Sequence, residues 1–83
     1  MSEATVIRVI QKNARESVRV ALDQFHNIDL LDIRILAHGD DGAEPQLTKK
    51  GIAIRVGKIA ELIEALQEAQ AEAVRRGLIG KAA

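Results

Sequence analysis

Hydrophobic and polar residues alternate along the first two thirds of the chain. Four runs rich in β-branched residues show this two-residue period, which is typical of strands with one face turned to a core. Turn-forming residues separate the runs, and the longest such stretch, 37–45, contains the only proline and is expected to be a mobile hairpin loop. The third run is the most apolar and is therefore expected to be central. The four predicted strands are Thr5–Lys12, Ser17–Leu22, Ile28–Leu36 and Lys50–Val56.

The period changes near Lys58. Apolar residues then recur at three- and four-residue spacing, with glutamates on the opposite side, which predicts an amphipathic helix over 58–76. Arg75 and Arg76 suit the negative end of the helix dipole, and Gly77 can adopt the left-handed conformation of a C-terminal cap. Residues 77–83 are expected to form a partly ordered tail.

These elements predict a single α+β domain spanning residues 1–83. An antiparallel sheet over 5–56, twisted as such sheets are, is followed by one long helix. No stretch approaches the roughly 20 apolar residues that span a bilayer. The first four residues also lack the plan of a signal peptide, so a cytoplasmic protein without membrane contact is expected.

The small size of the chain favours self-association. A chain of 83 residues with one aromatic buries only a modest core, and without cysteine it has no disulfide to add stability. One face of the helix forms a short a/d-like seam with small residues late in the helix, where a second helix could approach closely. An intramolecular core face explains Ile59, Leu62, Ile63 and Leu66 equally well. The predicted homodimer seam consists of Leu62, Leu66, Ala69 and Ala73.

Catalysis and metal binding find little support in the sequence. There is no glycine-rich phosphate loop, nucleophile motif or carboxylate–histidine cluster, so no enzyme activity is expected. His26 and His38 fall in presumed turns and are interpreted as exposed loop residues rather than metal ligands. No cofactor and no metal are expected.

The arrangement of charge is more informative than its sum. The 12 basic and 12 acidic residues give a formal charge of zero, so total charge does not indicate a nucleic-acid binder. Each predicted strand, however, places one arginine opposite its main apolar row, and four strands side by side would form an arginine-bearing face. Repeated cations suit phosphates, and an aromatic platform suits bases. The arginines are Arg8, Arg19, Arg34 and Arg55.

Each of these features also has a simpler interpretation. Asp32 shares a face with Arg34 and could neutralise it, while Phe25, the only aromatic residue, could be core beneath its own loop. The pair Lys49 and Lys50 could be a solvated pair at a hairpin base that blocks aggregation, or part of a phosphate track.

Three segments resemble the positive cofactor four (transcriptional coactivator) family of single-stranded-DNA-binding domains, in its short bacterial form. Residues 25–34 (FHNIDLLDIR) are similar to the family's aromatic turn and Asp-Ile-Arg strand, and 49–52 (KKGI) to its Lys-Gly-Ile strand entry. Residues 13–20 also resemble bacterial members. The resemblance covers roughly residues 13–76, with the segments in the family's order.

This resemblance implies a curved four-stranded antiparallel sheet whose C-terminal helix pairs in a homodimer and whose sheets hold single-stranded or melted DNA. It implies that Phe25 is the stacking aromatic, that Arg34 and Lys50 are the basic residues of the two motifs, and that Arg19 and Lys49 match basic positions nearby. The family commonly places aromatics after Asp-Ile-Arg, whereas 35–37 hold Ile, Leu and Ala.

Two functions are therefore expected as alternatives. The first is single-stranded DNA binding with little sequence specificity, by a homodimer that serves as a transcriptional coactivator or regulator, or as an accessory protein of DNA metabolism. Its partners would be DNA, a second copy of the chain and the transcription machinery. The alternative is a protein-interaction module that has lost nucleic-acid binding, which the missing aromatics and the balanced charge favour.

Overall fold

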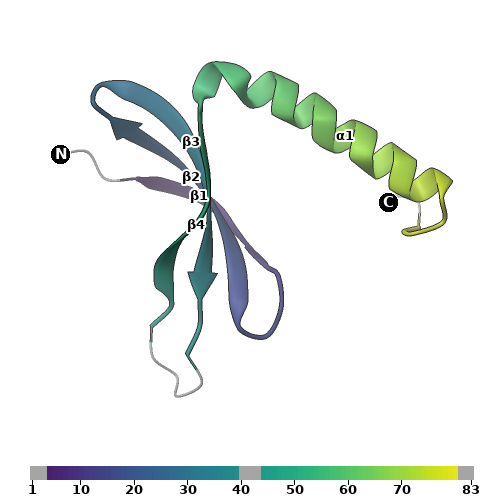
Figure 1. Ribbon diagram of the computed structural model, residues 1–83, viewed down its shortest axis with the longest axis horizontal. Helices are drawn as coiled ribbons and strands as arrows, with labels where there is room; N and C mark the ends of the chain where they lie inside the picture. The colour runs from purple at the N-terminus through teal and green to yellow at the C-terminus, as the bar shows by residue number, and fades with distance from the viewer. Residues whose placement is uncertain (1–3, 40–43, 81–83) are drawn as a thin grey trace.

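Four antiparallel strands form one sheet in the order β1-β2-β3-β4, and a single helix follows the last strand (Figure 1). The structure is a computed structural model and describes residues 4–39 and 44–80. The α+β class predicted from the sequence is confirmed. The elements are β1 (Thr5–Gln11), β2 (Glu16–Phe25), β3 (Ile28–Ala37), β4 (Gln46–Arg55), the short 3₁₀ helix η1 (Val56–Lys58) and α1 (Ile59–Arg75).

The strands β2 and β4 are longer than the hydrophobic alternation predicts. β2 continues through the polar pair Asp23 and Gln24, because both residues find partners on β3 in an unbroken register that ends at Phe25. β4 begins at Gln46, four residues before the predicted strand. The expected mobile loop lies partly in 40–43, and the expected tail partly in 81–83, both outside the described residues.

The register assigns each side chain to one of two faces, since directly paired residues point to the same side of a sheet. Arg19 pairs with Arg34, and Ala21 pairs with Asp32, so one face is rich in charge. The residues that alternate with these along each strand point to the opposite face, which is apolar. This apolar face carries Val18, Val20, Leu22, Leu31, Ile33, Ile35, Ile52 and Ile54.

An irregularity in β1 overturns one expectation about the arginines. The register shifts between Val6 and Arg8, so that Arg8 pairs with Val20 and Val9 pairs with Arg19. A β-bulge inserts one residue and thereby moves the following side chains to the other face. Arg8 therefore lies on the apolar face, and the predicted row of four arginines is wrong at this position.

Gly51 occupies a backbone conformation that other residues rarely adopt. Its φ is +151°, and an added Cβ would lie 2.1 Å from the carbonyl oxygen of Ile33 on the neighbouring strand. The requirement for glycine therefore has two causes, the dihedral angle and the close approach of two backbones.

We expect Gly51→Ala to lower the free energy of unfolding by about 2 kcal/mol, because the added methyl group forces β3 and β4 apart and strains the backbone. Urea denaturation followed by circular dichroism measures this change. Gly57→Ala is the control, because nothing lies within 4 Å of its Cβ position. Equal midpoints for the two variants would contradict the expectation.

The helix α1 runs away from the sheet instead of packing along it (Figure 1). None of its residues is buried, and Ile63 and Leu66 are 49% and 59% exposed. The alternative interpretation of the helix, in which an intramolecular core buries Ile59, Leu62, Ile63 and Leu66, is therefore wrong. The predicted cap is confirmed, since Gly77 has φ +74° and the N–H of Leu78 bonds the carbonyl of Ala73.

The buried core of the single chain is very small. Among the described residues, the hydrophobic side chains that are buried are only those of Ala21 and Leu31. Large apolar side chains such as Ile10 and Ile52 remain about half exposed. Over the same ranges, the structure has no helix with the length and apolar character needed to span a membrane. Many large apolar side chains of the described residues are thus left uncovered.

Candidate nucleic-acid interface

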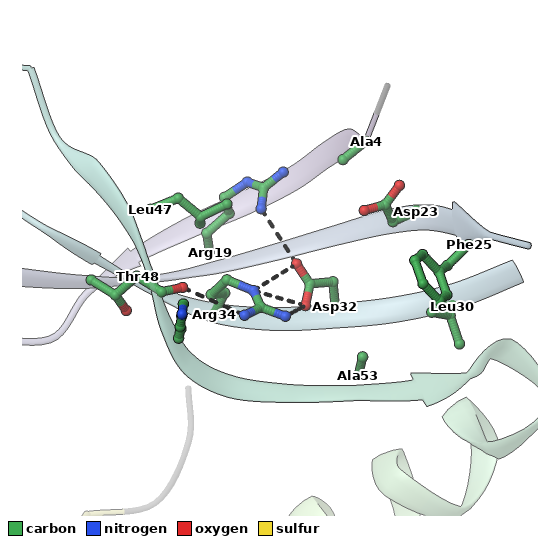
Figure 2. A pocket seen from close by; sticks show the side chains of 11 residues that line it. Ala4, Arg19, Asp23, Phe25, Leu30, Asp32, Arg34, Leu47, Thr48 and Ala53 are labelled. Atoms are coloured by element: carbon green, nitrogen blue, oxygen red, sulfur yellow. Dashed lines mark hydrogen bonds and ion pairs between the residues drawn. The ribbon is translucent and has the colours of Figure 1, made fainter. Parts of the chain in front are cut away.

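A cavity of about 530 Å³ opens on the charged face of the sheet (Figure 2). Strands β2, β3 and β4 all contribute side chains to it. It brings together four of the five residues predicted to contact nucleic acid, and it also contains two carboxylates. The polar and aromatic side chains around it are Arg19, Asp23, Phe25, Asp32, Arg34, Thr48 and Lys49.

Phe25 lies at one end of this cavity and is largely exposed. It is the last residue of β2, and the two residues of the turn that follows, His26 and Asn27, both have positive φ (51° and 63°). Two-residue hairpins favour this conformation because it matches the twist of the strands. Phe25 is 62% exposed, and its ring meets the imidazole of His26 edge to face, with the two ring centroids 4.0 Å apart. The interpretation of Phe25 as a core residue is therefore wrong.

Asp32 holds two arginines in the middle of the cavity. Its Oδ1 accepts a hydrogen bond of 2.8 Å from Nη2 of Arg34, and its Oδ2 lies 3.5 Å from Nη1 of Arg19. Nε of Arg34 also donates to both oxygens at 3.2 Å. The hydrogen bond to Asp32 raises the pKa of the Arg34 guanidinium above its usual value. The neutralisation of Arg34 by Asp32, one of the simpler interpretations, is confirmed.

The balance of charge in this trio nevertheless remains positive. Two guanidinium groups face the single buried carboxylate of Asp32, which leaves the trio with one net positive charge. Charge-assisted, bidentate bonds also fix the plane of an arginine side chain. The trio therefore provides ordered hydrogen-bond donors together with a modest positive field.

The two lysines have different surroundings. Lys49 lines the cavity, whereas Lys50 does not, and its Nζ lies 3.9 Å from Oε2 of Glu16. Thr48 donates to the carbonyl of Ile35 at 2.8 Å and accepts from the N–H of Lys50 at 3.2 Å. These bonds hold the irregular start of β4, where the register with β3 shifts. Lys50 thus lies outside the group that the other four predicted residues form.

Sequence reasoning missed several residues of the cavity. Asp23 and Leu30 pair with each other across β2 and β3. Asp23 lies two positions before Phe25, and Leu30 lies two positions before Asp32, so each shares a face with a residue named in the sequence analysis. Period-two spacing on the known strands could have found both. The apolar and small residues of the cavity that the sequence analysis did not name are Ala4, Leu30, Leu47 and Ala53.

The histidines are not equivalent. His26 is exposed, as expected, but His38 is partly buried and its Nε2 lies 2.8 Å from Oγ of Ser17. The interpretation of His38 as an exposed loop residue is therefore wrong. In the described ranges, no three His, Cys, Asp or Glu residues gather in a way that could hold a metal ion.

Similar proteins were found by comparison with solved structures. No protein-family model matches the chain, and the search of curated proteins found no match either. The crystal structure of BPSL1147, a PC4 homologue from Burkholderia pseudomallei, superposes with a TM-score of 0.73 and 26% identity, over 84% of this chain and 93% of that one. Its tetragonal crystal form gives a TM-score of 0.72 over 82% and 98%.

The chain has a PC4-like fold. The resemblance to the positive cofactor four family is thereby confirmed for the fold. A bacteriophage T5 homologue of the eukaryotic transcription coactivator PC4, implicated in recombination-dependent DNA replication, superposes with a TM-score of 0.62 over 93% of this chain and 90% of that one. Its 17% identity supports the fold alone.

The register of β2 and β3 locates the residues that stand where the resemblance implied aromatics. Ile35 pairs with Val18 on the apolar face, whereas Leu36 pairs with Ser17 on the face of Arg34. Leu36 is therefore the one position of 35–37 at which an aromatic side chain would have shared the charged face. At this position an aliphatic side chain, which cannot stack on a base as a ring does, takes its place.

Proposed function

We propose that the chain binds single-stranded DNA as a homodimer, with little dependence on sequence. The observation that carries this proposal is the exposed ring of Phe25 in the same cavity as Arg19, Arg34 and Lys49, on a PC4-like fold. Single-strand binders combine a stacking platform with cations that follow the phosphates. In this proposal the base stacks on Phe25, and the cations neutralise the phosphates on either side.

The homodimer is part of the same proposal. The apolar stripe of α1 and large side chains on the apolar face of the sheet remain uncovered in the single chain, and contiguous exposed apolar surface marks interaction sites. A second copy of the chain carries a matching stripe. We place the contact between helices at the predicted seam, whose residues are Leu62, Leu66, Ala69 and Ala73.

The cellular role follows from the PC4-like fold by analogy. We propose a transcriptional coactivator or regulator, or an accessory protein of DNA metabolism, that acts in the cytoplasm and contacts the transcription machinery. No residue is assigned a catalytic role, so the protein is proposed to act by binding alone. Lys50 remains in the proposal as a cation outside the cavity. Its ammonium group lies near Glu16 but is exposed, so a phosphate of the bound strand can reach it.

Fluorescence anisotropy of a labelled single strand of about twenty bases, titrated at two salt concentrations, tests this function. We expect binding that weakens with salt, with a slope in log K against log salt of about −0.7 for each phosphate contacted. A duplex of the same length should bind much more weakly, because its bases are not free to stack on Phe25.

A protein-interaction module remains the second candidate. The balanced charge, the engagement of both arginines by Asp32 and the aliphatic Leu36 favour it. No binding of the single strand even at low salt would support this candidate and contradict DNA binding. Capture of a partner protein by the dimer, with cross-links at the sheet edge or helix, would then identify its contact surface.

A further inference from the structure

Asp23 is the feature of the cavity that phosphate binding does not explain. It lies on β2 two residues before Phe25, on the same face of the sheet, and lines the same cavity (Figure 2). A carboxylate at this place repels phosphates and weakens a site that serves only to bind them. Its position beside the stacking ring suggests contact with a base instead.

The hydrogen bonds of Asp23 leave it able to accept more. Its Oδ1 accepts the N–H of Gln24 at 2.7 Å. No ion pair within 4 Å joins it to a lysine or arginine of the described residues, although, after Asp32, its charge also helps to raise the pKa of the nearby Arg34 guanidinium. An ionised carboxylate has about four acceptor positions and no donor. Asp32, in contrast, directs its oxygens at Arg19 and Arg34. Asp23 is thus the carboxylate of the cavity that remains available to a ligand.

We propose that Asp23 adds a base preference at the one position stacked on Phe25, favouring guanine and disfavouring thymine, to binding that otherwise depends little on sequence. The inference rests on the proposed binding of single-stranded DNA. A strand rises about 3.3 Å per residue, and Asp23 and Phe25 are two residues apart on the same face. The distance between them along the strand is therefore roughly the width of one base. A base lying on the ring can therefore present its Watson–Crick edge to the carboxylate.

The chemistry of the base edges sets the order of preference. Guanine presents two neighbouring donors, N1–H and the N2 amino group, which match the two oxygens of a carboxylate. Cytosine and adenine each present one amino group, and acidic side chains accept from the N4 amino group of cytosine in known complexes. Thymine places a carbonyl oxygen on each side of its single N–H, so both outer groups face the carboxylate with like partial charge.

The test compares three labelled strands of about twenty bases: alternating guanosine and thymidine, alternating inosine and thymidine, and thymidine alone. Inosine lacks only the N2 amino group of guanosine, and a lithium buffer prevents guanine quadruplexes. Since one hydrogen bond to a charged group changes affinity by about tenfold, we expect the guanosine strand to bind about tenfold more tightly than the inosine strand. The thymidine strand should bind most weakly.

Asp23→Asn is the decisive variant. It removes the charge but keeps the size of the side chain, so we expect the three affinities to converge and the affinity for the thymidine strand to rise. Asp29→Asn is the matched control, because Asp29 is exposed, pairs with Gln24 on the other face and causes the same change in net charge. Melting followed by circular dichroism confirms that both variants are folded.

The possible outcomes separate this inference from the function on which it rests. Loss of the guanosine preference in Asp23→Asn but not in Asp29→Asn supports it. Equal binding of the three strands by the unchanged protein, or a preference that Asp23→Asn leaves intact, overturns the inference while DNA binding stands. No binding of any strand overturns both.

Discussion

Replacing Leu66 with glutamate is expected to convert the proposed dimer into a monomer. Leu66 lies at the centre of the apolar stripe of α1 and is 59% exposed in the single chain, so a partner helix is what would bury it. A carboxylate at that position would lose its hydration without gaining a cation. We expect a loss of about 3 kcal/mol in the association free energy, which weakens the dimer by more than about a hundredfold.

Sedimentation equilibrium measures this change directly as the molar mass at a given concentration. Ala71→Glu is the matched control, because it adds the same charge at an exposed position on the other side of the helix. The control should keep the dimer mass. A Leu66→Glu protein that also keeps the dimer mass would show that the contact between copies lies elsewhere, for example on the apolar face of the sheet.

Phe25→Ala is expected to abolish most of the single-strand affinity. Stacking of a base on an aromatic ring contributes about 1–3 kcal/mol, so each ring lost should weaken binding by roughly ten- to a hundredfold. A strand that spans both copies of the proposed dimer loses two rings. Because the side chain is 62% exposed, its removal should leave the melting temperature nearly unchanged.

Anisotropy titration and thermal melting of the same Phe25→Ala sample separate binding from stability. Phe25→Trp provides the control, since a larger ring should keep or increase the affinity. Unchanged affinity of the alanine variant would mean that bases do not stack at this position. A large fall in melting temperature would mean that the ring stabilises the fold instead.

The sequence predicted the order and type of the elements because their periods are strong. The strand period of two and the helix period near 3.6 are local properties, and neither depends on how the elements meet. The end of β2 was missed because Asp23 and Gln24 look like a polar break. They continue the strand only because β3 supplies partners for them, which is a non-local effect.

The candidate site was predictable in part for the same reason. Alternation placed Arg19 and Arg34 on one face, and the structure brings both into one cavity with Phe25. Alternation failed for Arg8, because a single inserted residue at the bulge reverses every later side chain of β1. No local pattern of the sequence marks such a bulge.

The uncovered apolar surface has a consequence for how the protein should be handled. When two copies share a core, unfolding and dissociation become one equilibrium, and the melting temperature rises with total protein concentration. An affinity measured with nanomolar protein would then report on separated and partly unfolded chains. Two laboratories working at different dilutions would obtain different binding constants for the same molecule, and both would be correct.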